Sequence, residues 1–120
     1  MRWRVEFSEE VRVWYIGLSP PAQAAADRIL ERLEAQGHML RMPHSKPLGD
    51  GLFELRFTCE GVARRITYVL DPDRQAVTLT TFRKQRHNER AEVLRARRAQ
   101  AAHDAARQPR QETERKGKTR

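Results

Sequence analysis

Three short runs of alternating residues, joined by tight turns, place the strongest constraint on the fold. Residues 52–57, 63–70 and 76–82 alternate large apolar side chains with polar or charged ones, as strands with one buried face do. The connections at residues 59–61 and 71–73 hold Gly, Pro and Asp, which favour turns. Strands joined by short turns pair antiparallel, so the sequence predicts an antiparallel meander.

The residues before this meander predict one more strand and a helical hairpin. Residues 3–7 alternate Trp, Val and Phe with Arg and Glu, which indicates a half-buried strand. Ser8 and Ser19 each precede a helical apolar pattern and are typical N-cap residues. Gly17 and Gly37 follow these patterns, as expected where helices end. We therefore expect two consecutive helices packed over one face of the sheet.

The remaining segments predict a loop, a C-terminal helix and a tail. Residues 38–51 contain two prolines and a Gly-Asp-Gly turn, which indicates a loop. Residues 85–106 have a helical pattern whose apolar side is mostly alanine, so this helix should pack only lightly and leave the second sheet face polar. Residues 108–120 contain no aliphatic side chain and predict a basic, disordered tail. Residues 1–107 then form a single α+β domain.

Positive charge is concentrated after the last predicted strand. The formal net charge is +8, and residues 83–120 carry 13 basic and 5 acidic side chains, whereas residues 1–82 carry 11 of each. All but four of the basic residues are arginines, whose planar fork suits phosphate. A basic charge of this kind predicts that the chain binds a nucleic acid, an acidic partner or an anionic surface. A single cysteine and the lack of any apolar run of membrane length predict a cytoplasmic protein.

Strand alternation gathers cations on the polar face of the sheet. Arg56 and Arg65 lie on the face opposite the apolar residues of their strands. Lys84 joins them if the alternation of the last strand continues, whereas Arg83 then points the other way. One cysteine and scattered histidines do not make a zinc site, and no phosphate-binding glycine loop is present. We therefore expect neither a metal nor a cofactor.

The run HSKPLGDGLFELRF…GVARRITYVLD…VTLTTFRKQ resembles the RelE/HigB toxins of the RelE/ParE superfamily, especially their phage-derived branch. The shared pattern is Lys-Pro-Leu before a Gly-Leu-aromatic-Glu-Leu-Arg strand, an Arg at the start of the next strand, and Phe-x-Lys after the last. The resemblance extends over roughly residues 3–95. It implies the RelE-like fold, in which an N-terminal strand and an αα-hairpin pack on a small twisted antiparallel sheet, followed by a C-terminal helix.

The resemblance also implies a function. Members of this group are toxins of type II toxin–antitoxin systems that act as ribosome-dependent endoribonucleases, or mRNA interferases. Such an enzyme aligns the RNA 2′-hydroxyl with the adjacent phosphorus, stabilises charge on the phosphorane and protonates the leaving 5′-oxygen, without a metal. The implied partners are the ribosome, mRNA and a cognate antitoxin, typically a helix-turn-helix protein of HigA type, and no membrane.

The family motif assigns roles to individual residues. Arg65 matches the phosphate-contacting arginine, Lys84 matches the basic residue at the leaving group, and Arg56 occupies a basic position on the preceding strand. His87 is the candidate general acid or base, because an imidazole titrates near neutral pH. Contacts to RNA or the ribosome are expected from the basic residues around this face, namely His44, Lys46, Arg64, Arg83, Arg86 and Arg90.

One departure from the family keeps other functions open. RelE carries a catalytic tyrosine near its C-terminal end, whereas this chain has Arg90 near that place and no tyrosine after Tyr68. A ParE-like inhibitor of DNA gyrase would need no nuclease chemistry, because related folds serve different functions. A non-catalytic basic module that binds RNA or the ribosome is a further alternative, as is a toxin that has lost its activity.

Overall fold

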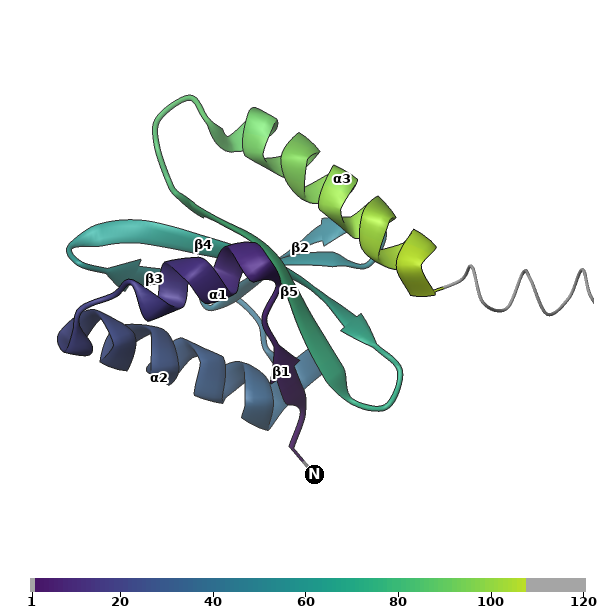
Figure 1. The fold of residues 1–120 in the computed structure, drawn as a ribbon, viewed down its shortest axis with the longest axis horizontal. Helices are drawn as coiled ribbons and strands as arrows, with labels where there is room; N and C mark the ends of the chain where they lie inside the picture. Colours follow the sequence, from purple (N-terminus) through teal and green to yellow (C-terminus); the bar gives the residue numbers. More distant parts are fainter. Residues whose placement is uncertain (1, 108–120) are drawn as a thin grey trace, which may run out of the picture.

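The computed structural model describes residues 2–107, which form a five-stranded sheet and three α-helices (Figure 1). The strand order is β1-β5-β4-β3-β2, antiparallel except for the parallel β1–β5 pair. The predicted α+β class is confirmed. Along the chain the elements are β1 (Arg4–Glu6), α1 (Glu9–Ile16), α2 (Pro20–Gln36), the 3-10 turn η1 (Gly37–Met39), β2 (Ser45–Gly49), β3 (Leu52–Cys59), β4 (Val62–Asp71), β5 (Gln75–Arg83) and α3 (Glu89–Arg107).

The helical hairpin begins and ends where the sequence predicts. The Ser8 hydroxyl accepts a hydrogen bond from the Val11 amide at 3.2 Å, and Ser19 caps α2 in the same way. Gly37 ends α2 with φ of 50°. A β-carbon at Gly37 would lie about 2.0 Å from the Trp3 indole, so only glycine lets β1 approach the end of α2 this closely.

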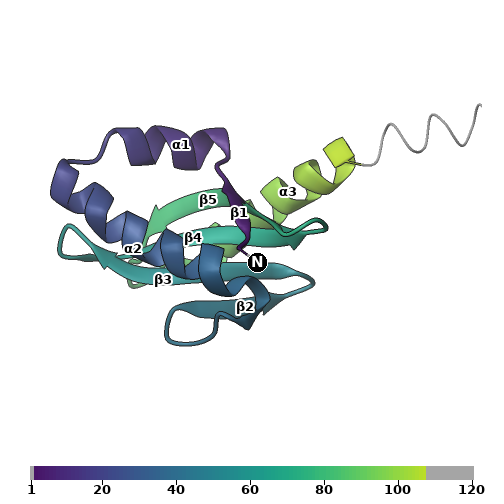
Figure 2. The same cartoon turned by 90° about the horizontal axis from the view of Figure 1, so that it is seen from below.

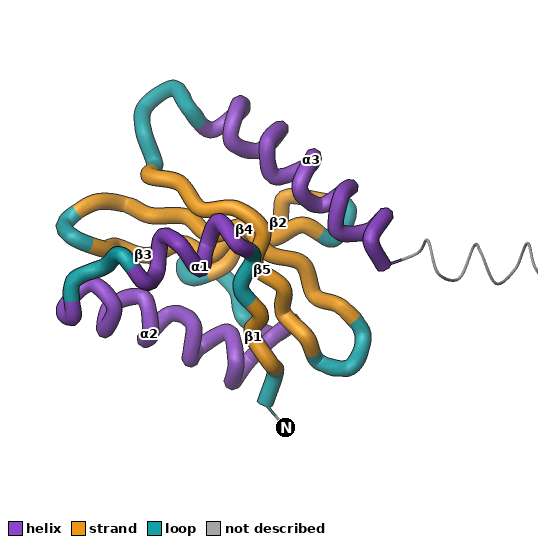
Figure 3. Tube along the Cα trace, viewed as in Figure 1, coloured by secondary structure: helices purple, strands orange, loops and turns teal. Residues whose placement is uncertain are grey.

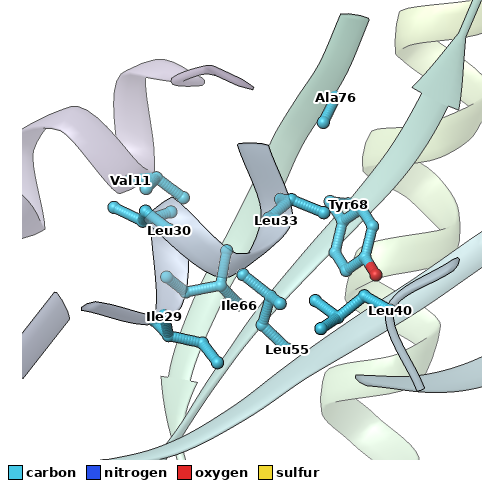
Figure 4. Close-up of a cluster of buried hydrophobic side chains, with 9 residues drawn as sticks. All are labelled: Val11, Ile29, Leu30, Leu33, Leu40, Leu55, Ile66, Tyr68 and Ala76. Carbon is cyan, nitrogen blue, oxygen red and sulfur yellow. The ribbon is translucent and has the colours of Figure 1, made fainter. Parts of the chain in front are cut away.

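The main core lies between the helical hairpin and one face of the sheet. Figure 2 shows α1 and α2 together on one side of the strands. The predicted inward-facing residues of β3 and β4 are buried or half-buried here, as are the apolar stripes of α1 and α2. The buried side chains of this cluster (Figure 4) are Val11, Ile29, Leu30, Leu33, Leu40, Leu55, Ile66, Tyr68 and Ala76.

The N-terminal segment joins the sheet beside the last strand, as Figure 3 shows. Beyond the short β1 pairing, side chains replace a strand partner along the exposed edge of β5. The Thr78 hydroxyl donates to the Glu6 carbonyl and accepts from the Ser8 amide, and the Ser8 hydroxyl donates to the Leu79 carbonyl. These bonds connect residues about seventy positions apart and so fix the entry of α1.

The expectation of a wholly polar second face is wrong. Part of that face is covered by α3, which buries Leu52, Val69, Leu79 and Ala96 in a second, smaller core. Alanines keep α3 close to the strands, and Leu79 lies on this side together with Val77, two residues before it. Only the part of the face beyond α3 stays polar.

Two element boundaries also differ from the sequence-based expectation. Residues 45–49, expected in a loop, form the edge strand β2, whose register places Lys46 opposite Glu54. The last helix begins at Glu89 rather than at residue 85, because the Asn88 side chain donates to the Arg83 carbonyl and accepts from the Gln85 amide. Those two bonds close a turn that precedes the helix. The predicted tail, residues 108–120, lies outside the described residues.

Candidate functional site

Two arginines face each other on the uncovered part of the second sheet face. Arg56 of β3 and Arg65 of β4 are direct cross-strand partners. The Arg65 side chain is only 8% exposed, and that of Arg56 is 27% exposed. Like charges directly opposite on a sheet destabilise it. An acidic residue on the same face, Glu54, offsets part of this repulsion.

Glu54 is a buried carboxylate with an incomplete environment. Its Oε1 lies 3.6 Å from the Arg65 Nε and 4.0 Å from the Arg56 Nε. The side chain is fully buried, and neither carboxylate oxygen has a hydrogen-bond donor among the described residues. Burial raises the pKa of Glu54, as does nearby Glu89, whereas Arg65, Arg56 and Lys46 oppose the shift. Burying such a group without hydrogen bonds costs free energy, and a function would explain why the chain retains it.

The other end of this face carries a lysine that is already paired. Lys84 follows β5, and its amide donates to the Ala63 carbonyl at 2.8 Å, which holds the residue against β4. Its ammonium forms an ion pair with Glu89, the first residue of α3. The hydrogen bond from Lys84 lowers the pKa of Glu89, so this carboxylate is charged at neutral pH.

These side chains form one group, called the charged cluster below. Lys46 is exposed on β2 and shares the face because it pairs with Glu54 in register. The cluster has four cations and two carboxylates, and therefore keeps an excess of positive charge. Its members are Lys46, Glu54, Arg56, Arg65, Lys84 and Glu89.

The predicted residue His87 lies in the exposed turn between Lys84 and α3. Within residues 2–107 it makes no hydrogen bond or ion pair, and the same is true of Arg86 and Arg90. These three side chains border the cluster along the chain but have no described contact with it.

Arg64 and Arg83 lie on the opposite face from the cluster. They are cross-strand partners, and the Arg64 guanidinium lies 4.9 Å from the centre of the Trp14 ring and donates to the Thr81 hydroxyl. Stacking on an aromatic ring of α1 gives Arg64 a structural role. The structure thus separates these two residues from Arg56 and Arg65.

Sequence reasoning did not assign functions to Glu54 and Glu89. Alternation placed Glu54 on the polar face, where an acid usually meets solvent. The available signal was its position two residues before Arg56, on the same face and diagonal to Arg65 across the strands. Within residues 2–107, no group of three or more His, Cys, Asp or Glu is placed to hold a metal ion, and no helix is long and apolar enough to span a membrane.

A sheet of this order with an αα-hairpin on one face is the fold of RelE toxins. The chain superposes on a variant of the E. coli toxin RelE in the free state with a TM-score of 0.57 and 10% identity, over 80% of this chain and 94% of that chain. It also superposes on the toxin–antitoxin complex RelBE2 from Mycobacterium tuberculosis with a TM-score of 0.51 and 22% identity, over 70% of this chain and 100% of that one. No curated protein is similar to it in sequence.

The family is set by the sequence itself. The family model described as phage derived protein Gp49-like matches residues 14–107. The chain therefore belongs to the Gp49-like family of phage-derived proteins. The expected resemblance to the phage-derived branch of RelE-like proteins is confirmed.

Proposed function

We propose that this chain is the toxin of a type II toxin–antitoxin system and acts as a ribosome-dependent endoribonuclease. The observation that carries the proposal is the pair Arg56 and Arg65 with a buried carboxylate beside them, Glu54, which accepts no hydrogen bond from the described residues. Two guanidinium groups on one face suit the non-bridging oxygens of a single phosphate. This chain lacks the catalytic tyrosine of RelE, and the Glu54 carboxylate is a group that can accept a proton in its place.

In the proposed reaction, Glu54 removes the proton of the RNA 2′-hydroxyl as that oxygen attacks the adjacent phosphorus. Arg56 and Arg65 stabilise the charge that develops on the phosphorane. Lys84 stabilises or protonates the departing 5′-oxygen, so that a 2′,3′-cyclic phosphate and a 5′-hydroxyl are left. His87 stays a second candidate for proton transfer, because its loop connects Lys84 to α3.

The buried position of Glu54 suits a general base once substrate binds. An ordinary glutamate is a weak base, and burial brings its pKa closer to neutral pH. Because Glu54 is fully buried, substrate reaches its carboxylate only after a covering side chain moves away. A bound phosphate would draw Arg56 and Lys84 away from their present partners, Glu54 and Glu89, and so would open the site.

A partner follows from the same proposal. The solved relative RelBE2 is a toxin–antitoxin complex, and we expect a co-encoded antitoxin for this chain, of helix-turn-helix HigA type. Co-expression with the product of the neighbouring reading frame should relieve growth inhibition and allow a complex to be isolated. A neighbouring frame with no effect on toxicity would remove this part of the proposal.

The test of cleavage is primer extension on mRNA in programmed ribosomes. We expect wild-type protein to produce ribosome-dependent cuts, and Arg65→Ala and Lys84→Ala each to lower the rate by about 10²–10³-fold, as the loss of one charge-stabilising donor does. Arg98→Ala, an exposed change on α3, is the control and should cut normally. Intact mRNA with wild type would reject the proposal, and a DNA supercoiling assay would then test gyrase inhibition.

A further inference from the structure

A second basic surface lies beside the charged cluster, around the edge of β3. The strand β2 pairs with β3 only as far as Leu55, so beyond Arg56 residues 57–59 have no strand partner on this side. There the Arg56 amide donates to the His44 carbonyl at 2.9 Å. Between this edge and α2 runs an open groove of about 390 Å³, whose lining includes Arg28, Arg32, Pro43, His44, Arg56 and Phe57.

The groove carries positive charge with no acid to balance it. Arg28 and Arg32 lie one turn apart on α2, and among residues 2–107 neither forms an ion pair or a hydrogen bond. No carboxylate is among the described residues that line the groove. Like charges at this spacing destabilise a helix slightly. Exposed Arg12 is paired with Glu9, whereas the two arginines on α2 have no such counter-charge, which an anionic ligand would supply.

The floor of the groove is apolar. Ile29, Pro43 and Phe57 line it, and the Phe57 ring is held by an edge-to-face contact with Trp14, with 6.2 Å between the ring centres. A cationic rim over an apolar floor matches a single nucleic-acid strand, which presents phosphates on one side and unstacked bases on the other. Base pairs in a duplex are stacked and do not reach such a floor.

We propose that this groove binds the phosphodiester backbone of the RNA strand next to the bond that is cut. The inference rests on the proposed function and names where the substrate continues. Arg56 carries the connection, because it is among the residues that line the groove, its Nη1 donates to the Met42 sulfur beside Pro43, and its Nε lies 4.0 Å from Glu54 in the cluster. One strand can therefore pass from the cluster to α2 along continuous positive charge. Arg28 and Arg32 are positioning residues that hold the strand in register with the cluster.

Binding of RNA that cannot be cut tests this separately from cleavage. Fluorescence anisotropy over a salt series would compare a trinucleotide with a longer single-stranded oligomer, both 2′-O-methylated so that no attack occurs. The test variant is Arg28→Gln/Arg32→Gln. The control, Arg4→Gln/Arg98→Gln, removes the same charge from two exposed arginines outside the groove. Arg28→Lys/Arg32→Lys keeps the charge, and equal urea midpoints would verify folding.

We expect Arg28→Gln/Arg32→Gln to weaken binding of the longer oligomer by about tenfold or more. The slope of log affinity against log salt should fall by about 1.4, because each phosphate of a single strand that a cation neutralises adds about 0.7 to this slope. Trinucleotide binding should be unchanged, and the lysine variant should retain most of the affinity. The control should weaken binding by no more than about twofold, because distant charges are screened.

Three results would overturn the inference. The first is no binding of either oligomer by wild type at low salt, and the second is an equal loss of affinity in the test and control variants. The third is that Arg28→Gln/Arg32→Gln loses as much affinity for ribosomes without mRNA as for the longer oligomer. The last result would assign the groove to ribosomal RNA instead of the substrate strand. Because the oligomers cannot be cut, failure of the mRNA-cleavage assay would reject the nuclease while leaving the groove intact. Conversely, normal mRNA cleavage by wild type together with unchanged oligomer binding in Arg28→Gln/Arg32→Gln would reject the groove and leave the nuclease proposal intact.

Discussion

At the scale of single residues, Glu54 lies between two cations yet accepts no hydrogen bond from the described residues. Charged groups taken out of water cost several kcal/mol unless good geometry compensates. The separations of 3.6 Å and 4.0 Å to the two arginine Nε atoms are too long for hydrogen bonds. This arrangement weakens the fold locally and leaves the carboxylate available to accept a proton.

The pH dependence of cleavage should report Glu54. A general base acts only when ionised, so the single-turnover rate should fall with a slope of about one as pH drops through its pKa, which burial raises above 4.5. Glu54→Gln should slow cleavage by about 10²–10⁴-fold and remove this acid limb. Glu60→Gln, an exposed change at the β3–β4 turn, is the control. A Glu54→Gln enzyme with the wild-type profile would assign the base elsewhere.

The same substitution has a predicted effect on stability. A carboxyl whose pKa is raised on folding binds its proton more tightly in the folded state. Its contribution to the free energy of unfolding is therefore fully present below pH 4.5 and is lost as pH rises through the raised value. Urea titrations at several pH values should reveal this loss in wild type and a smaller one in Glu54→Gln. An identical pH dependence in both proteins would contradict the environment described for Glu54.

In the proposed reaction, Glu89 competes with substrate for Lys84. Its carboxylate holds the ammonium at the position proposed for the leaving group. Glu89→Gln should lower KM by about 2–5-fold, the range expected when a partly exposed ion pair worth up to about 1 kcal/mol is removed. Glu92→Gln is a matched control, because Glu92 pairs with Arg95 instead. If both variants bind RNA alike, Glu89 does not compete with the phosphate.

Some site residues were predictable from sequence and others were not. Alternation and the family motif were enough to place Arg56 and Arg65 on one face. They did not distinguish a solvated Glu54 from a buried one, because that difference depends on the side chains of β4 and α3 around it. Arg28 and Arg32 have the spacing of an ordinary solvated helix face. Only the structure shows that they line a groove between α2 and the free edge of β3.

At the scale of elements, α3 is attached mainly by polar contacts. Its apolar contribution is small, with Ala96 the only fully buried residue in the helix. The Arg97 guanidinium donates to the carbonyls of Leu48 and Gly49 at 2.6 and 2.7 Å, and His103 contacts Asp71 at 2.8 Å. The helix is therefore held at the β2–β3 turn and at the end of β4.

Removal of the Arg97 side chain should loosen α3. Arg97→Ala eliminates two charge-assisted hydrogen bonds and leaves two carbonyls unpaired, so we expect a decrease of about 1–2 kcal/mol in the free energy of unfolding. Urea denaturation measures it. Arg98→Ala, at the adjacent exposed position, should change stability by less than about 0.5 kcal/mol. Equal effects would mean that the two variants differ from wild type only through helix propensity.

Periodicity was sufficient to predict most elements, with β2 as the exception. The three long strands and the helical hairpin have clear patterns, strong caps and short turns. The strand β2 has five residues, of which Pro47 cannot donate to a ladder and Gly49 favours turns. Such an edge strand forms because β3 offers it a partner. Its sequence alone therefore predicts a loop.

At the scale of the whole molecule, the two ends of the described chain meet around β5. The strand β1 and the start of α1 contact one edge of β5, while α3 lies on its second face. Arg95 of α3 pairs with Glu10 of α1 and donates to the Thr81 carbonyl. These contacts make β5 the element on which the hairpin, the sheet and the last helix all depend.

Substitution of Thr78 tests how much these long-range contacts between the N-terminal segment and β5 contribute to stability. Thr78→Val keeps the shape of the side chain but removes the hydroxyl shared by Glu6 and Ser8. Leaving the Ser8 amide without its acceptor should cost about 1–3 kcal/mol, measurable as a lower urea midpoint. Thr58→Val, an exposed change on β3, is the control. If Thr78→Val is as stable as wild type, water replaces the hydroxyl at no cost and these contacts depend on packing alone.

The parallel pairing of β1 with β5 also affects how the chain folds during its synthesis. During synthesis the first strand has no partner until residues 75–77 have left the ribosome, and contacts between such distant segments form slowly. The face that carries the charged cluster cannot assemble on the nascent chain before β4 and β5 are both available. Under the proposed function, the chain would therefore be inactive on the ribosome that makes it and would gain its activity only near or after release.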